Sequence, residues 1–255
     1  MAIALARPRA FSLLGWLRVV LRLSAMIALL LVSVPVFYLA KLLGGRNPVP
    51  PLFLAGIGWI AGVRLRTQGQ KVRRGAFLLA NHVSWIDVPA LAATTGSAFV
   101  GHDGLASMPL LKWLCRMNET VFVARHDRTS VADQVTQVRT AVSDTGALTI
   151  FPEGTTSDGT GLLPFKSSLL SALEPVPSGV AVQPVLLDYG AEAADISWIG
   201  EEHGLDNFLR ILARRRPVDL TVRFLPVLTG AALTNRKTMA AAAREAMLTA
   251  LNMQR

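Results

Sequence analysis

The stretch AFLLANHVSWIDVP, residues 76–89, places a short apolar run directly before a group of polar side chains and a proline. The run at 76–80 has the length and composition of a buried strand. His82 and Asp87 follow it, five positions apart. If a helix begins at Ser84, the two side chains converge across its first turn, where free backbone N–H groups can stabilise an oxyanion. A histidine oriented by a carboxylate is a general base at neutral pH, although this spacing alone does not separate a catalytic pair from a structural one.

A second polar stretch, FPEGTTSDG at 151–159, also follows an apolar run. Glu153 and Gly154 are followed by the hydroxyl side chains of Thr155, Thr156 and Ser157. Such a turn suits polar groups of a ligand. Taken alone, the same residues are also typical of a turn that caps a helix.

Further apolar runs, separated by polar or glycine-rich turns, predict a series of strands. They span residues 76–80, 98–101, 120–124, 148–151, 180–187 and 220–225. A helix between the third and fourth has a possible capping box at Ser130 and Asp133, and its apolar face holds Val131, Val135, Val138 and Val142. A terminal helix follows Asn235. Alternating strands and helices predict an α/β fold, with residues 64–255 as a single domain whose largely parallel central sheet is flanked by helices.

Residues 1–63 differ in character from the rest of the chain. The run at 23–40 carries no charge, and neither does the run at 48–63, which includes three prolines and three glycines. Both runs are shorter than the stretch of about 20 apolar residues that a helix needs to cross a bilayer. We therefore expect an N-terminal membrane-associated helical pair that dips into one leaflet, with a kink at Pro35.

The charge distribution also favours an N-terminal segment that associates with a membrane. Residues 1–80 hold eleven basic groups and no acidic one, so all 17 acidic groups lie in the remainder of the chain, where they slightly outnumber the basic ones. Cations that bracket apolar runs favour an anionic membrane surface over nucleic acid as the partner.

Several kinds of chemistry lack their usual signatures. The four histidines, His82, His102, His126 and His203, form no metal-ligand spacing, and Cys115 is the single cysteine. The chain has no G-x-S-x-G elbow, no phosphate-binding P-loop and no dinucleotide fingerprint. We therefore expect neither a metal nor a bound cofactor.

Taken together, NHVSWID, which begins at Asn81, and FPEGTTSDG, which begins at Phe151, resemble the first and third sequence blocks of the glycerolipid acyltransferase family, which includes bacterial 1-acylglycerol-3-phosphate acyltransferase. The resemblance covers roughly residues 77–187. The segment at 99–125 resembles the second block and ends at Arg125, and AVQPVLL at 181–187 resembles the fourth. The family's N-terminal two-helix membrane motif also matches the paired apolar runs.

The resemblance implies a mechanism and a set of site residues. His82 would take the proton from the free hydroxyl of a lysolipid, Asp87 would orient His82, and the hydroxyl would attack an acyl thioester. The thioester would come from acyl-CoA or acyl-carrier protein, at the cytoplasmic face of the cell membrane. The implied acceptor site holds Arg125, Glu153, Gly154, Thr155 and Thr156.

Two departures from the family's pattern concern the acceptor head group. The second block usually reads Lys-x-Glu-Leu, where this chain has HDGL at 102–105, and the third usually has arginine at the position of Thr156. Both changes remove a cation, the preferred partner of phosphate, although Arg125 and Lys166 could still supply charge. The expected acceptor is 1-acylglycerol-3-phosphate, giving phosphatidic acid. The alternative is lyso-ornithine lipid, because the variant resembles the branch that acylates it.

Two functions from other classes stay open at this point. In a serine-type lipid hydrolase, Ser84 would be the nucleophile and His82 its base. In a non-catalytic lipid-binding module, the N-terminal apolar segment would carry the function.

Overall fold

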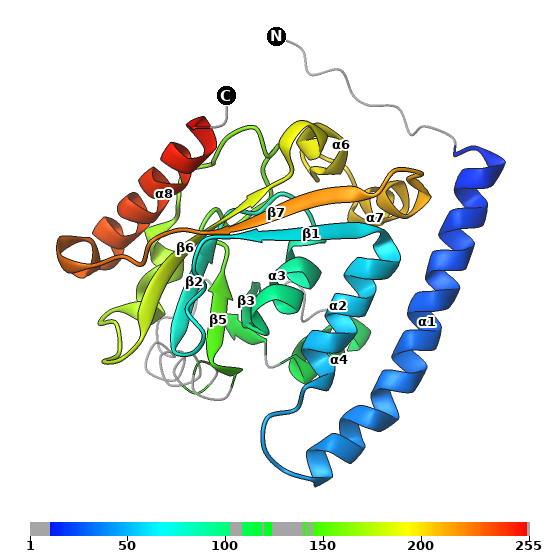
Figure 1. The fold of residues 1–255 in the computed structure, drawn as a ribbon, viewed down its shortest axis with the longest axis horizontal. Coiled ribbons are helices and arrows are strands. Elements are labelled where there is room, and N and C mark those ends of the chain that lie inside the picture. Colours follow the sequence, from blue (N-terminus) through cyan, green and yellow to red (C-terminus); the bar gives the residue numbers. More distant parts are fainter. Residues whose placement is uncertain are drawn as a thin grey trace.

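The computed structural model describes residues 11–102, 109–118, 120–123, 140, 142 and 145–253. They form a seven-stranded sheet in the order β1-β7-β6-β2-β5-β3-β4 (Figure 1). Neighbouring strands run parallel except β6 and β7, which confirms the largely parallel sheet. The strands are β1 Val63–Gln68, β2 Ala76–Ala80, β3 Ala98–His102, β4 Val121–Val123, β5 Ala147–Ile150, β6 Ala181–Asp188 and β7 Val218–Phe224.

Six of these strands lie where apolar runs predict them, within one or two residues, but β1 was missed. Its sequence, VRLRTQ, alternates apolar and polar residues, and its two arginines enter the sequence analysis only among the eleven basic groups of residues 1–80. β1 is an edge strand whose partner is β7. Arginines on an edge strand discourage pairing with a further chain, which accounts for basic residues in this part of the sheet.

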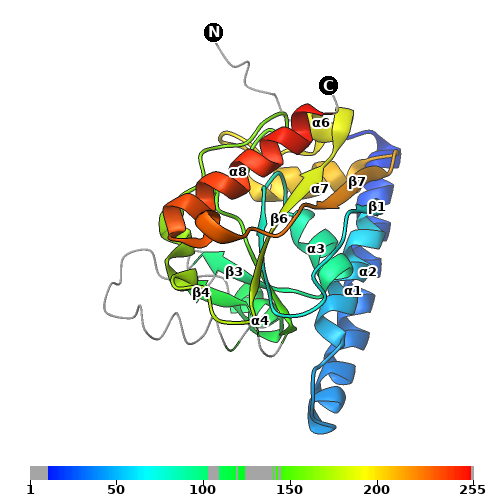
Figure 2. The ribbon, with the colours of Figure 1, turned by 60° about the vertical axis from the view of Figure 1, so that its left-hand side comes forward.

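Helices cover both faces of the sheet (Figures 1 and 2). On β2, Phe77 and Leu79 pack toward α8 and η3, whereas Leu78 and Ala80 pack toward α3 and α7. The helices are α1 Leu13–Leu42, α2 Val49–Ala61, α3 Asp87–Thr95, α4 Pro109–Met117, α6 Ala193–Ile196, α7 Gly204–Ala213 and α8 Arg236–Asn252, and the 3-10 helices are η3 Ser167–Leu173, η4 Gly190–Glu192 and η5 Gly230–Leu233.

The predicted C-terminal helix is confirmed as α8, which begins after Asn235. The Asn235 side chain accepts hydrogen bonds from the backbone N–H groups of Lys237 and Thr238, and Thr238 Oγ1 accepts one from Asn235. This capping box satisfies N–H groups that the first helical turn leaves free. Of the helix expected near residues 130–142, only residues 140 and 142 are described; both are helical, and Val142 is buried. Its predicted capping box lies outside the described residues.

The N-terminal segment forms the expected pair of helices, but α1 is longer than its uncharged run. It has 30 residues and continues through Pro35. Exposed apolar side chains include Leu31 and Leu39 on α1 and Trp59 on α2. By length and composition α1 could cross a membrane, and it extends beyond the sheet (Figure 2). Whether the pair crosses or dips stays a prediction, as does a domain division after residue 63.

Some N-terminal cations stabilise the fold. Arg18 and Arg22 of α1 donate hydrogen bonds to carbonyls at the C-terminus of α7. Arg46 and Lys71 donate to the carbonyls of residues 96 and 94 at the C-terminus of α3. Cations at these positions satisfy free carbonyls and oppose the negative end of the helix dipole. Part of the basic excess that the sequence assigned to lipid therefore caps helices.

Candidate active site

His82 and Asp87 are brought together where β2 ends. His82 Nδ1 lies 2.7 Å from Asp87 Oδ2, and that oxygen also accepts the backbone N–H groups of Val83, at 2.6 Å, and Ser84, at 2.9 Å. The helix begins at Asp87 and not at Ser84, so the aspartate itself lies in its first turn. The backbone N–H groups of residues 83 and 84 both donate to Asp87. The expectation that N–H groups here are free to stabilise an oxyanion is therefore wrong for these two residues.

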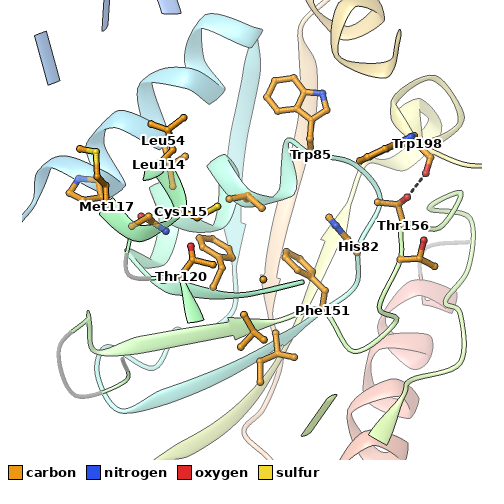
Figure 3. A pocket seen from close by; sticks show the side chains of 18 of the residues that line it. Leu54, His82, Trp85, Leu114, Cys115, Met117, Thr120, Phe151, Thr156 and Trp198 are labelled. Carbon is orange, nitrogen blue, oxygen red and sulfur yellow. Dashed lines mark hydrogen bonds between the residues drawn. The ribbon is translucent and has the colours of Figure 1, made fainter. Parts of the chain in front are cut away.

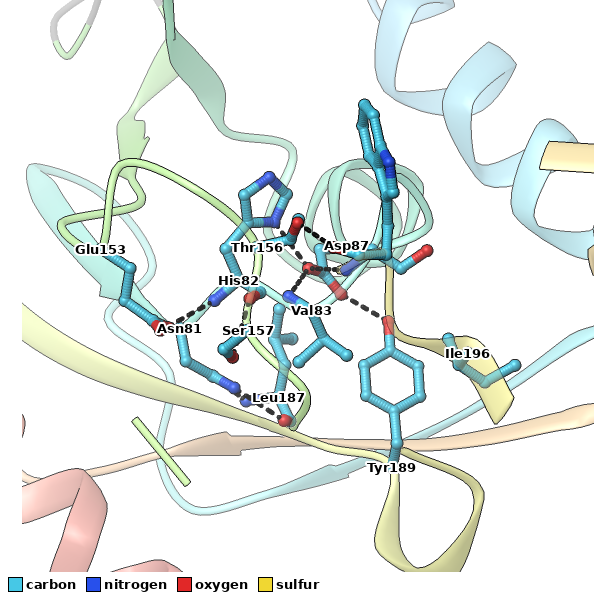
Figure 4. A network of polar contacts seen from close by, with 12 residues as sticks. Asn81, His82, Val83, Asp87, Glu153, Thr156, Ser157, Leu187, Tyr189 and Ile196 are labelled. Carbon is cyan, nitrogen blue, oxygen red and sulfur yellow. Dashed lines mark hydrogen bonds and ion pairs between the residues drawn. The ribbon is translucent and has the colours of Figure 1, made fainter. Parts of the chain in front are cut away.

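The second carboxylate oxygen of Asp87 has its own donor. The hydroxyl of Tyr189, directly after β6, donates to Asp87 Oδ1 (Figure 4). Both side chains are buried. Burial, together with the charge of Asp87, raises the pKa of Tyr189 well above its ordinary value, so the phenol stays protonated and keeps donating. Tyr189 completes a chain from His82 through Asp87 that sequence reasoning did not identify.

Glu153 holds the backbone of His82 in place. One carboxylate oxygen accepts the N–H of His82 at 2.9 Å, and the other accepts the N–H of Leu163 at 2.9 Å. Burial raises the pKa of Glu153, partly offset by these hydrogen bonds. Ser157 donates its backbone N–H, at 2.7 Å, and its hydroxyl, at 3.0 Å, to the carbonyl of His82. The FPEGTTSDG turn thus binds both the backbone N–H and the backbone carbonyl of His82.

Two further contacts orient this corner of the sheet. The ring of His82 stacks on Phe151, with centroids 4.1 Å apart. Asn81 accepts the N–H of Leu187 at 2.7 Å and donates to its carbonyl at 3.1 Å. The Asn81 side chain therefore extends the pairing of β2 with β6 beyond the last strand residue, which keeps the His82 loop close to β6.

A cavity of about 770 Å³ opens beside His82 (Figure 3). One arm is apolar and runs between α2 and α4, where Leu54, Leu114 and Met117 line it. The other end lies beside the FPEGTTSDG turn and is lined by Gly154, Thr155, Thr156, Trp198 and Glu202. Three of the predicted acceptor residues therefore face the cavity. Glu153 instead faces the His82 loop, and Arg125 lies outside the described residues.

The segment at 198–202 forms a wall of this cavity that no motif predicted. The N–H of Trp198 donates to the carbonyl of Val83 at 2.9 Å, and the Thr156 hydroxyl donates to the carbonyl of Trp198. Thr156 therefore anchors this wall at the position where the family pattern has arginine. In the sequence, the signal nearest to this contact is the replacement of the family's arginine by Thr156.

Ser84 is not placed to act as a nucleophile. Its side chain is fully buried, and its hydroxyl donates to Asn207 Oδ1 at 3.3 Å. Ser84 is also absent from the cavity lining among the described residues. A serine hydrolase with this nucleophile is therefore contradicted by the geometry.

Known proteins of similar sequence are acyltransferases. An acyltransferase family model matches residues 63–188. A lyso-ornithine lipid O-acyltransferase of Brucella abortus is 32% identical over 246 residues, covering 89% of this chain and 91% of that protein. A 1-acyl-sn-glycerol-3-phosphate acyltransferase of Neisseria gonorrhoeae is 34% identical over 115 residues, covering 45% and 44%.

The fold also has a solved counterpart. The crystal structure of the 1-acyl-sn-glycerophosphate acyltransferase PlsC from Thermotoga maritima superimposes with a TM-score of 0.64 at 18% identity, covering 93% of this chain and 97% of that one. At this identity the likeness concerns the fold. The near full-length match to the Brucella protein, the family match and the paired blocks around His82 and Glu153 show that this chain is an enzyme of the lysolipid acyltransferase family.

Proposed function

We propose that the protein is a lyso-ornithine lipid O-acyltransferase, which moves a fatty acyl group from a thioester to the free hydroxyl of a lyso-ornithine lipid. The match to the Brucella enzyme over 91% of its length carries this proposal. The match to the Neisseria lysophosphatidate enzyme covers less than half of either chain. The acceptor expected first from the sequence, 1-acylglycerol-3-phosphate, is thus less well supported than the alternative.

The dyad supports general-base catalysis. An ionised Asp87 accepts a hydrogen bond from Nδ1–H of His82, which fixes the tautomer and leaves Nε2 as the base. Nε2 takes the proton of the acceptor hydroxyl as its oxygen attacks the thioester carbonyl. The tetrahedral intermediate then expels the thiolate, which takes up the proton from His82 to give the free thiol and the new ester. Because the thioester is already activated, no covalent enzyme intermediate is needed.

The shape of the cavity supports two substrates that meet at His82. The arm lined by Leu54, Leu114 and Met117 suits a fatty acyl chain, because burying methylene groups there is favourable. The end beside Thr155 and Thr156 suits a polar head group. His82 lies between them (Figure 3), where hydroxyl and thioester can be held in reacting geometry.

The acyl donor in this proposal is acyl-CoA or acyl-carrier protein, and the reaction needs neither a metal nor a bound cofactor. The enzyme works at the cytoplasmic face of the cell membrane, where acyl thioesters are available. Exposed apolar side chains on α1 and α2, together with N-terminal cations, suit contact with an anionic lipid surface.

Lysophosphatidate remains the second candidate, favoured by the Neisseria relative. The ammonium of Lys166 lies near the cavity residue Gly154, since a Cβ built on Gly154 would lie 3.2 Å from Lys166 Nζ. Lys166 could therefore serve either acceptor. That ammonium could pair with the carboxylate of ornithine or with a phosphate, and so it does not discriminate between the two.

The test uses the purified protein in detergent micelles with one labelled acyl donor and each lysolipid in turn. We expect kcat/KM to favour lyso-ornithine lipid by about tenfold or more, the size of a well-placed polar contact. A value that is equal or higher for lysophosphatidate would overturn the proposed acceptor.

A further inference from the structure

Glu202 has a distinct place among the described residues that line the cavity. It is the one Asp, Glu, Lys or Arg residue among them, and it lies at the end of the cavity that Thr155, Thr156 and Trp198 also line. It also lies outside residues 63–188, which the family model matches. An acidic side chain in a cavity suits a ligand that carries a cation and opposes one that carries a phosphate.

The carboxylate of Glu202 is held in one orientation. Arg210 donates from Nε to Oε1 and from Nη2 to Oε2, each at 2.9 Å. The buried Asn207 donates to Oε2 at 3.1 Å. Two parallel bonds from a guanidinium fix the plane of a carboxylate. Oε1 keeps room for a further donor, because a carboxylate oxygen has two lone pairs and the bond from Arg210 occupies one of them.

The position of Arg210 shows that it does not itself offer a charge to the cavity. It is absent from the cavity lining among the described residues, and its other donors reach the backbone carbonyls of Asp195 and Ser197. Arg210 therefore orients the carboxylate of Glu202 without itself lining the cavity. The Glu202 side chain keeps about a quarter of its surface exposed, at 25%, so a ligand can reach it.

A short chain of hydrogen bonds connects Glu202 to the catalytic loop. Trp198 donates its indole N–H to the carbonyl of Glu202 at 2.6 Å and its backbone N–H to the carbonyl of Val83 at 2.9 Å. Val83 directly follows His82. The carboxylate is therefore carried by a segment whose position relative to the catalytic histidine is fixed.

We propose that Glu202 is the subsite for a primary ammonium group on the acceptor lipid, and thereby a specificity-determining residue. This inference rests on the proposed function, since the side chain of ornithine ends in such an ammonium. With its hydroxyl at His82, the acceptor directs its head group along the Thr156–Trp198 wall, and its ammonium donates to Oε1 of Glu202. A phosphate head group would instead meet a like charge at this position.

The test compares two acceptors that differ only in this charge: lyso-ornithine lipid and the same lipid acetylated on its side-chain amine. The wild-type enzyme should show a KM about tenfold or more higher for the acetylated lipid. In Glu202→Gln the KM for lyso-ornithine lipid should rise by a similar factor with kcat nearly unchanged. The KM for the acetylated lipid should stay constant.

The matched control is Glu201→Gln, the same chemical change at an exposed neighbour outside the cavity lining, which should alter neither KM. Equal use of both lipids by the wild-type enzyme would overturn the subsite, even if Glu202→Gln failed to fold. Equal losses on both lipids in Glu202→Gln would also overturn it, since Glu202 would then only hold Arg210 and Asn207. Preference of the wild-type enzyme for lysophosphatidate would instead refute the proposed function.

Discussion

His82 and Asp87 share a contact in which a single carboxylate oxygen serves three donors: Nδ1 of His82 at 2.7 Å and the backbone N–H groups of residues 83 and 84. The carboxylate therefore holds the ring and the loop that carries it. An asparagine at position 87 keeps the size of the side chain but cannot accept all these bonds. We expect Asp87→Asn to lower kcat by about a hundredfold or more, measured at saturating acceptor. Nearly full activity in this variant would contradict the dyad.

Tyr189 should act as a positioning residue through Asp87. Its phenol stays protonated because burial and the charge of Asp87 raise its pKa. In Tyr189→Phe the carboxylate loses a donor, becomes more basic and holds the proton of the His82 imidazolium more tightly. Since His82 must be neutral to act as a base, the acidic limb of the pH profile of kcat/KM should move to higher pH.

The chain offers a matched control for this variant. Tyr38, the other of its two tyrosines, is on α1 and 49% exposed, and Tyr38→Phe should leave the pH profile unchanged. A purely structural role for Tyr189 would lower the amount of active enzyme without moving the limb. That result would refute its action through Asp87.

Glu153 should make stability depend on pH. Burial raises its pKa above the ordinary value of 4.5, so the folded protein binds this proton more tightly than the unfolded chain. The stability gained this way is fully present below pH 4.5 and is lost as the pH rises through the raised pKa. Glu153→Gln cannot ionise. Its free energy of unfolding should therefore rise relative to that of the wild type as the pH increases over this window.

Urea unfolding at a series of pH values measures this difference, with Glu201→Gln as the exposed control. A wild-type protein that gains stability over Glu153→Gln across the same window would show that the hydrogen bonds from His82 and Leu163 outweigh burial. Independently of pH, Glu153→Gln should lower kcat, because one of the two backbone donors then faces an amide NH₂ group.

Ser84 gives a direct check on the hydrolase mechanism that the geometry contradicts. Its buried hydroxyl donates to Asn207, so Ser84→Ala should retain acyl transfer within about threefold and lose about 1 kcal/mol of stability. Loss of turnover together with an acyl group trapped on Ser84 in the wild-type enzyme would restore the nucleophile hypothesis.

Sequence reasoning succeeded where the determining pattern was local. The apolar run of β2 followed by NHVSWID was sufficient to place His82 and Asp87 at a strand end, and FPEGTTSDG marked the end of β5. The two strands are parallel neighbours, and parallel strands bring their carboxyl ends to the same edge of a sheet. The two motifs therefore meet, as the resemblance implied.

The residues that were missed depend on contacts between distant parts of the chain. Tyr189 lies 102 positions after Asp87, and only the register of β2 with β6 brings them together. Glu202 is in a connection without a motif and reaches the cavity because Trp198 binds the His82 loop. The role predicted for Glu153 was incomplete for a similar reason. Its neighbours in sequence do not reveal that its carboxylate accepts the N–H of His82.

The most direct measurement is the rate of labelled acyl transfer to lyso-ornithine lipid by the purified wild-type enzyme and by His82→Asn. We predict turnover of lyso-ornithine lipid by the wild-type enzyme that exceeds its turnover of 1-acylglycerol-3-phosphate. We also predict a loss on the order of a hundredfold or more in His82→Asn, as expected when a general base is removed. Unchanged transfer by His82→Asn would refute His82 as the general base.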